Sequence, residues 1–153
     1  MKIEPLNNKE LFILCDLLNL PIVQIDRKDR MQFKHDGCYI INLQSWNEGG
    51  GSHWTALYRI GKTNIYFDSF GVAPPYDIIQ QLHNQDICYF DDQIQDIEST
   101  ACGYFCLVFL YVMHNNIQHG IDYAVSKIDN MFHDPEFNDS ILSHILKVIL
   151  SEK

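Results

Sequence analysis

The sequence has few basic residues for its size, and this shortage limits the partners it can bind. Its 153 residues include 11 lysines and arginines against 20 aspartates and glutamates, a formal net charge of −9. Binding along nucleic acid needs a basic face that offsets the phosphate charge. One basic run, at positions 27–34, is interrupted by aspartates and is expected to form a solvated loop. The composition therefore argues against a protein whose main task is to coat DNA or RNA.

The sequence also lacks a long apolar stretch and a recognisable secretion signal. No apolar run reaches the roughly 18 residues that a bilayer-spanning helix needs. Residues 1–12 do not follow the charged-then-apolar order of a signal peptide. The cysteines have no regular spacing and occupy positions 15, 38, 88, 102 and 106. We therefore expect free thiols in a reducing compartment, no membrane association and no secretion, and we predict no metal site.

What the sequence contains is an ordinary globular composition. Apolar residues make up 46% of the chain and charged residues 20%, which is typical of a chain with a packed core. No internal repeat, low-complexity tract or long linker divides it. We predict one domain over residues 1–153 and expect a monomer.

Apolar periodicity predicts both helices and strands. Residues 8–19 have helical spacing and end before Pro21, and two strand-like runs, 53–60 and 64–68, flank a tight connection at Gly61 and predict a β-hairpin. The remaining predicted elements are short strands at 39–43 and 86–90, a short helix at 76–83, and amphipathic helices near 119–131 and 136–150.

Residues 103–113 are apolar on every side, so a helix there must be covered all round by the rest of the protein. We predict an α+β fold. In it a small, mostly antiparallel sheet packs around this buried central helix, which starts at Cys102, with flanking helices.

Cys102 is the first candidate for chemistry, because polar and small residues lead directly from Gln95 into the apolar helix. A cysteine at a helix N-terminus meets the positive end of the helix dipole and unpaired N–H groups, which favour the nucleophilic thiolate. The same N–H groups can receive an oxyanion. The alternative is a small buried cysteine without a chemical role. This segment alone does not separate the two interpretations.

A thiolate nucleophile needs a base, and the base needs an orienting group. Seven histidines are present, and most fall in loops or on helices where solvated or packing roles are common. His53 differs, because it opens a strand directly after the glycine-rich stretch 49–52. The predicted hairpin brings Asp68 to the same end of the sheet, where a carboxylate could hold the imidazole.

Three blocks together resemble the adenovirus protease (adenain) family. They are Gly51-Ser52-His53-Trp54, the run Tyr66-Phe67-Asp68-Ser69-Phe70-Gly71, and Gln95 followed seven residues later by Cys102 in Ala101-Cys102-Gly103. Related proteases that process SUMO and other ubiquitin-like proteins share the order His, Asp, Gln, Cys. The resemblance extends from the N-terminal helix to about residue 113.

The resemblance implies a role for each matched residue. Cys102 would be the nucleophile, His53 the general base, Asp68 the orienting acid and Gln95 a side-chain oxyanion donor. Adenoviral enzymes have Glu where this chain has Asp68, and the SUMO-type enzymes have Asp. Adenoviral enzymes are also activated by a short peptide tethered through a disulfide, for which Cys88 is the counterpart candidate; the alternative for Cys88 is a buried strand thiol. Those enzymes respond to DNA, whereas the charge of −9 argues against a DNA cofactor here.

The first functional hypothesis is a cysteine endopeptidase that cleaves viral capsid or core precursors at Gly-containing, Gly-Gly-like sites during virion maturation. The resemblance then implies a protein that acts in the infected cell and is packaged in the virion. The second hypothesis is a protease that removes ubiquitin or a SUMO-like modifier. The third is an inactive scaffold with the same fold, which is weakened because all four matched positions hold chemically competent residues.

Overall fold

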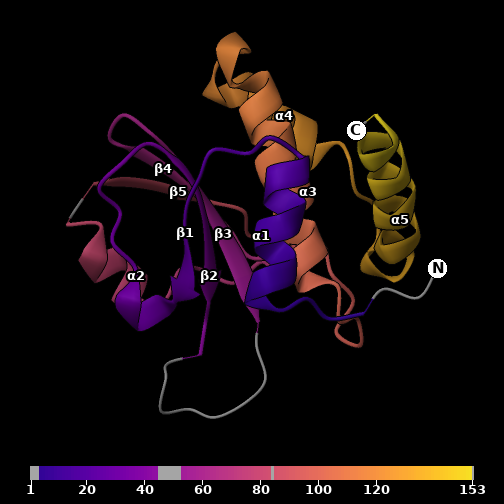
Figure 1. The fold of residues 1–153 in the computed structure, drawn as a ribbon, viewed down its shortest axis with the longest axis horizontal. Helices are drawn as coiled ribbons and strands as arrows, with labels where there is room; N and C mark the ends of the chain where they lie inside the picture. The colour runs from indigo at the N-terminus through magenta and orange to yellow at the C-terminus, as the bar shows by residue number, and fades with distance from the viewer. Residues whose placement is uncertain (1–3, 45–52, 84, 153) are drawn as a thin grey trace.

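The computed structural model describes residues 4–44, 53–83 and 85–152. In this part of the chain, a five-stranded sheet lies between a group of helices on one face and a short helix on the other (Figure 1). The strands are β1 (Ile22–Arg27), β2 (Gly37–Asn42), β3 (Trp54–Ile60), β4 (Thr63–Phe67) and β5 (Asp86–Tyr89). The helices are α1 (Asn8–Leu17), α2 (Tyr76–Gln81), α3 (Cys102–Asn116), α4 (Ile121–Asp129) and α5 (Pro135–Ser151), with 3-10 turns η1 (Lys28–Arg30) and η2 (Ile117–His119).

The strands lie in the sheet in their sequence order, β1-β2-β3-β4-β5. The β2–β3 and β3–β4 pairs are antiparallel, whereas the edge strands β1 and β5 are added in parallel. Gly61, at the tip of the β3–β4 hairpin, has a φ of 61°, a conformation that glycine adopts without strain. The predicted α+β fold, with a central helix that starts at Cys102, is confirmed.

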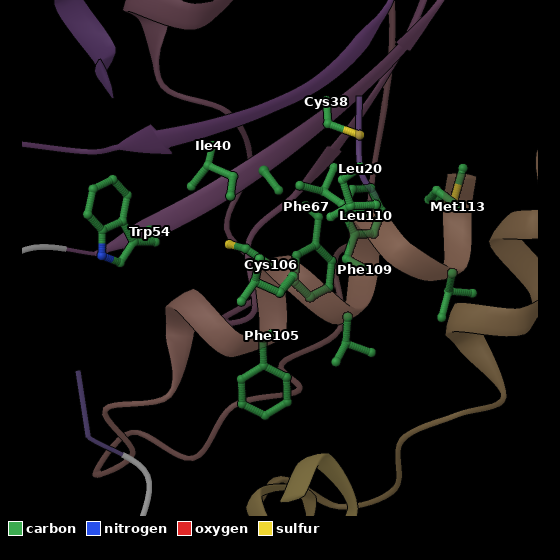
Figure 2. Packing of buried hydrophobic residues seen from close by; sticks show 14 of the residues in the cluster. Leu20, Cys38, Ile40, Trp54, Phe67, Phe105, Cys106, Phe109, Leu110 and Met113 are labelled. Carbon is green, nitrogen blue, oxygen red and sulfur yellow. The ribbon is translucent and has the colours of Figure 1, made fainter. Parts of the chain in front are cut away.

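Helix α3 lies at the centre of the larger core. Ten of its fifteen residues are buried, as its all-apolar sequence requires. The aromatic ring of Phe109 stacks on that of Phe67 from β4, with centroids 4.7 Å apart and planes 6° apart. Figure 2 shows these rings with Ile40, Cys106 and Trp54 nearby. Packing of α3 against the sheet therefore fixes the helix start relative to β3 and β4.

The opposite face of the sheet has a smaller core of its own. Because successive strand residues point to opposite faces, Tyr39, Leu57 and Tyr66 lie on this side while their neighbours face α3. Ile78 and Leu82, from α2 and the residue after it, cover them. The sheet is thus buried on both faces, which makes it a rigid support for residues at its strand ends.

One strand of the described sheet was missed from the sequence. Strand β1 carries a single buried residue, Ile25, and its other positions are partly or fully exposed, so it has no apolar run to mark it. The last residue of this strand, Arg27, is basic and belongs to the run that was predicted to form a loop. Among the described residues no helix has the length and apolar character that crossing a membrane requires.

Candidate active site

Cys102 is the first residue of α3, and the helix start is shaped by small residues. Ala101 is the N-cap and accepts the first helical bond, from the Phe105 N–H to its carbonyl at 3.0 Å. Among the described residues, no side chain caps this helix start. A Cβ on Gly103 would lie 3.3 Å from Leu6, so glycine allows the N-terminal segment to pack closely there. The first N–H groups of α3 are therefore left for a ligand or water.

His53 lies immediately before β3, and a hydrogen bond from the residue after β2 fixes its backbone. The glycine-rich stretch 49–52 that precedes it in the sequence lies outside the described residues. The Leu43 N–H donates to the His53 carbonyl at 3.0 Å, which continues the β2–β3 pairing by one residue. The next residue, Trp54, donates its backbone N–H to the Cys102 Sγ at 3.4 Å. This last contact was not predictable from residue types, because a main-chain group makes it.

Asp68 follows β4 and completes a chain of three side chains. Its Oδ1 lies 2.7 Å from the His53 Nε2 and also accepts the Phe70 N–H at 2.8 Å. The His53 ring hydrogen-bonds Cys102 as well. Because Asp68 occupies Nε2, the nitrogen that serves Cys102 is Nδ1. The structure therefore brings His53, Asp68 and Cys102 together, as their positions in the sequence suggested.

The surroundings of His53 raise the pKa of its imidazole. Burial by itself lowers the pKa, but hydrogen bonds to Asp68 and Cys102, with the negative charges of both partners, raise it to about 9. The imidazole is therefore protonated at neutral pH when Cys102 is the thiolate. A thiolate beside a protonated imidazole is the combination that thiol-dependent hydrolysis uses.

One aromatic ring covers His53, whereas the ring of the adjacent Trp54 packs in the core. The Phe70 ring stacks on the imidazole, with centroids 4.8 Å apart and planes 30° apart. Trp54 is 2% exposed and belongs to the core, and its indole Nε1–H donates to the Leu6 carbonyl at 2.9 Å. Trp54 therefore has the packing role expected of a large aromatic residue, and Phe70 is the side chain that covers the imidazole face.

Gln95 is buried in the segment that leads to Cys102, and both ends of its side chain are held. Its Oε1 accepts the Ser69 hydroxyl at 2.5 Å, and its Nε2 donates to the Ser99 carbonyl at 2.8 Å. Exposed Gln93 donates its side-chain amide to the Gln95 carbonyl at 3.0 Å. Gln93 thus supports Gln95 from outside, and the oxyanion role of Gln95 stays a prediction.

The four other cysteines divide into two groups. Cys15, Cys38 and Cys106 are buried, and burial raises the pKa of the Cys15 and Cys38 thiols to about 12 and that of Cys106 well above its usual value. Cys88 is exposed on edge strand β5, so the alternative of a buried strand thiol is wrong. Within the described ranges, no three potential metal ligands gather closely enough to hold an ion.

Selective alkylation is the first test of this site. We expect iodoacetamide to modify Cys102 faster than any other cysteine at pH 6–7, because the thiolate is the reactive form and His53 stabilises it. Cys102 is buried but keeps 8% exposure, whereas Cys15, Cys38 and Cys106 are 0% exposed. Exposed Cys88 is therefore the competitor, and a Cys88→Ser variant isolates the alkylation rate at Cys102. His53→Ala should remove the selectivity, which peptide mapping by mass spectrometry measures. Equal rates at Cys88 and Cys102 in the unmodified chain would contradict the pairing.

The raised pKa of His53 predicts two pH effects. Its value of about 9 in the folded protein exceeds the usual value near 6.5, so protonation favours the folded state. That stabilisation is complete below about pH 6.5 and is lost as the pH rises through about 9. We expect any activity that needs the imidazolium to fall above about pH 9. Asp68→Asn removes the partner charge and should move this fall to lower pH; an unchanged pH profile would contradict the Asp68 assignment.

Comparisons with known proteins place the fold in context. No protein-family model matches the chain, and no curated protein does. A crystal structure of ASFV pS273R protease is similar at 14% identity, covering 77% of this chain and 57% of that one, with a TM-score of 0.46. The selenomethionine form of ASFV pS273R protease matches at 19% identity over 69% of this chain and 41% of that one, with a TM-score of 0.42. The chain therefore spans about half the length of these structures.

Proposed function

We propose that the protein is a cysteine peptidase that hydrolyses peptide bonds through a covalent intermediate on Cys102. The observation that carries the proposal is the chain of three side chains at one end of the sheet. His53 lies between Asp68 and Cys102, the first residue of a buried helix. The Asp68 Oδ1 is 2.7 Å from the His53 Nε2. Hydrolysis by a thiol nucleophile uses this arrangement, in which a nucleophile, a base and a group that orients the base are in hydrogen-bond contact.

We propose one step for each group. The Cys102 Sγ attacks the scissile carbonyl carbon, and the carbonyl π electrons move onto oxygen. The imidazolium then gives its Nδ1 proton to the leaving amine as the C–N bond breaks, which leaves an acyl thioester. A water molecule, deprotonated by the neutral imidazole, attacks the thioester and releases Cys102 as the thiolate. Asp68 holds the ring at Nε2 throughout and stabilises its charged form.

The negative oxygen needs donors that are in place before the reaction. The free N–H groups at the start of α3 lie beside the nucleophile, since Cys102 is the first residue of the helix. The Gln95 amide carries a second N–H besides the one bonded to Ser99, and this is the donor we assign to the oxyanion. Its bonds to Ser69 and Ser99 limit the motion of the Gln95 side chain. The amide can therefore stabilise the oxyanion without first changing its own position.

For the substrate, we propose viral capsid or core precursor proteins cleaved at Gly-containing, Gly-Gly-like sites, as the resemblance in the catalytic blocks implies. Such an enzyme would act in the infected cell and in the particle. The exposed Cys88 on edge strand β5 supports tethering of an activating peptide, because the thiol is accessible and the strand has one side without a partner strand in the described sheet. Removal of a ubiquitin-like modifier is the alternative, since those enzymes share the order of the four residues.

One parallel assay tests the proposal and separates its two substrate classes. Purified protein is incubated with a capsid precursor that contains Gly-Gly sites and, separately, with ubiquitin and SUMO carrying a C-terminal thiol-reactive group. Cleavage next to glycine supports maturation, and a covalent adduct with a modifier supports deconjugation. Absence of both, with Cys102 no more reactive than Cys88, would leave the inactive scaffold as the surviving hypothesis.

A further inference from the structure

Asn138 is a polar residue in a fully buried position. It lies in the first turns of α5, is 0% exposed, and has every hydrogen-bonding hydrogen of its side chain in use. Its Nδ2 donates to the Ile94 carbonyl at 2.8 Å and to the His133 carbonyl at 2.9 Å, and its Oδ1 accepts the His133 N–H at 2.8 Å. A buried amide is tolerated when it is fully bonded, and these bonds join the start of α5 to the distant segment at Ile94.

The bond to Ile94 reaches the segment that carries Gln95. The backbone N–H groups of Ile94 and Gln95 both donate to the Ser69 carbonyl at 2.8 Å. The peptide groups around Ile94 are therefore held from two directions, by Ser69 at the end of the catalytic Asp68 turn and by Asn138 from α5. This fixes the backbone immediately before Gln95.

The neighbouring residue of α5 holds the other end of the same segment. Asp139 Oδ1 accepts the Ser99 hydroxyl at 2.9 Å. The same Ser99 oxygen accepts the Ala101 N–H at 3.2 Å, and the Ser99 carbonyl accepts the Gln95 side chain at 2.8 Å. Ala101 directly precedes the nucleophile, so Asp139 is connected to the start of α3 through one hydroxyl group.

We propose that Asn138 and Asp139 are positioning residues that fix both ends of residues 94–101 and thereby set the oxyanion donors beside Cys102. The inference deepens the proposed peptidase function and rests on it. It gives α5 a role in the reaction, although α5 contributes no residue to the three-membered chain at His53. Asn138 is also the acceptor position of the glycosylation sequon Asn138-Asp139-Ser140, and its buried, fully bonded amide is not accessible for that modification.

The first test compares Asn138→Ala with Leu142→Ala, an equally buried change one turn later on α5. Hydrolysis of a fluorogenic Gly-Gly peptide amide is measured at a temperature well below the melting temperature of every variant. We expect Asn138→Ala to lower kcat at least tenfold with KM within twofold, because the oxyanion site acts on the transition state. Leu142→Ala should lower the melting temperature and leave kcat within twofold. Equal kcat values for the two variants would overturn the proposal.

The second test uses rescue by a conservative change. Asp139→Ala should lower kcat, whereas Asp139→Asn keeps an oxygen that can accept the Ser99 hydroxyl and should recover most of the loss. Glu136→Ala removes a carboxylate from the exposed first turn of α5 and serves as the charge control. If Glu136→Ala and Asp139→Ala lower kcat equally, the effect is one of charge and the positioning role is wrong.

Amide hydrogen exchange provides a readout that does not need activity. Asn138→Ala should speed exchange in residues 94–101, and Leu142→Ala should leave that segment at its original rate. If exchange there is the same in both variants, the structural link is wrong even if kcat falls. If the original protein does not cleave the peptide although Asn138→Ala loosens this segment, the proposed function fails and the catalytic part of this inference fails with it.

Discussion

Cys102→Ala is expected to abolish peptide hydrolysis and leave the fold intact. The substitution removes the only atom that can form the acyl intermediate, so no partial compensation by His53 or Gln95 is available. In a comparable triad protease, loss of the nucleophile costs about 10⁶ in kcat. The side chain is small, so the fold should survive with only a modest fall in the melting temperature, caused by loss of the buried sulfur and of its bond from the Trp54 N–H.

Cys106→Ala is the matched control for this experiment. Cys106 lies one helical turn further along α3, is completely buried and belongs to the core that Figure 2 shows. We expect its replacement to lower the melting temperature through lost packing and to retain activity. The assignment of the nucleophile is wrong if Cys102→Ala stays active and Cys106→Ala does not.

Gln95→Ala is expected to give the second large effect, a loss of about 10²–10³ in kcat with little change in KM. Removing one preorganised oxyanion donor has an effect of this size in a comparable protease. The split between kcat and KM follows because the donor bonds an oxygen that becomes negative only as Cys102 attacks. Steady-state kinetics with a fluorogenic Gly-Gly peptide amide measures both constants.

Two further variants separate the oxyanion role from simple loosening of the loop. Gln95→Glu keeps an oxygen for the Ser69 hydroxyl but places a carboxylate near the developing charge, so it should be slower than Gln95→Ala. Gln93→Ala removes an exposed amide that bonds only the Gln95 carbonyl among its described contacts, and its loss should be small. A large kcat loss at Gln93 alone would move the oxyanion donor to that residue, and no loss at either would remove it.

The sequence predicted the buried helix and the positions of Cys102, His53 and Asp68 at the ends of regular elements, because the signals for these elements are local. An all-apolar run after a polar segment indicates a covered helix with Cys102 at its start, and the hairpin around Gly61 brings His53 and Asp68 to one end of the sheet. The contact itself, at 2.7 Å, depends on strand register and on the turn after β4, which residue types alone do not fix.

The contacts that could not be predicted from the sequence join residues far apart in the chain or involve main-chain groups. The N–H of Trp54 reaches the Cys102 sulfur across 48 positions in sequence, and no side-chain type marks it. Asn138 lies 44 positions from Ile94 and sits inside a sequence that resembles an exposed modification site. Edge strand β1 was missed because an edge position needs few apolar residues.

The central claim is that Cys102 carries the acyl group, and the most direct measurement is the site of a trapped adduct. The protein is incubated with a Gly-Gly peptide that ends in a chloromethyl ketone. The thiolate displaces chloride from it to form a stable thioether, and the modified peptide is located by tandem mass spectrometry. We predict modification at Cys102 alone, with none in Cys102→Ala and strongly slowed formation in His53→Ala. Modification of Cys88 in place of Cys102, or peptide cleavage by a Cys102→Ala protein, would contradict the account.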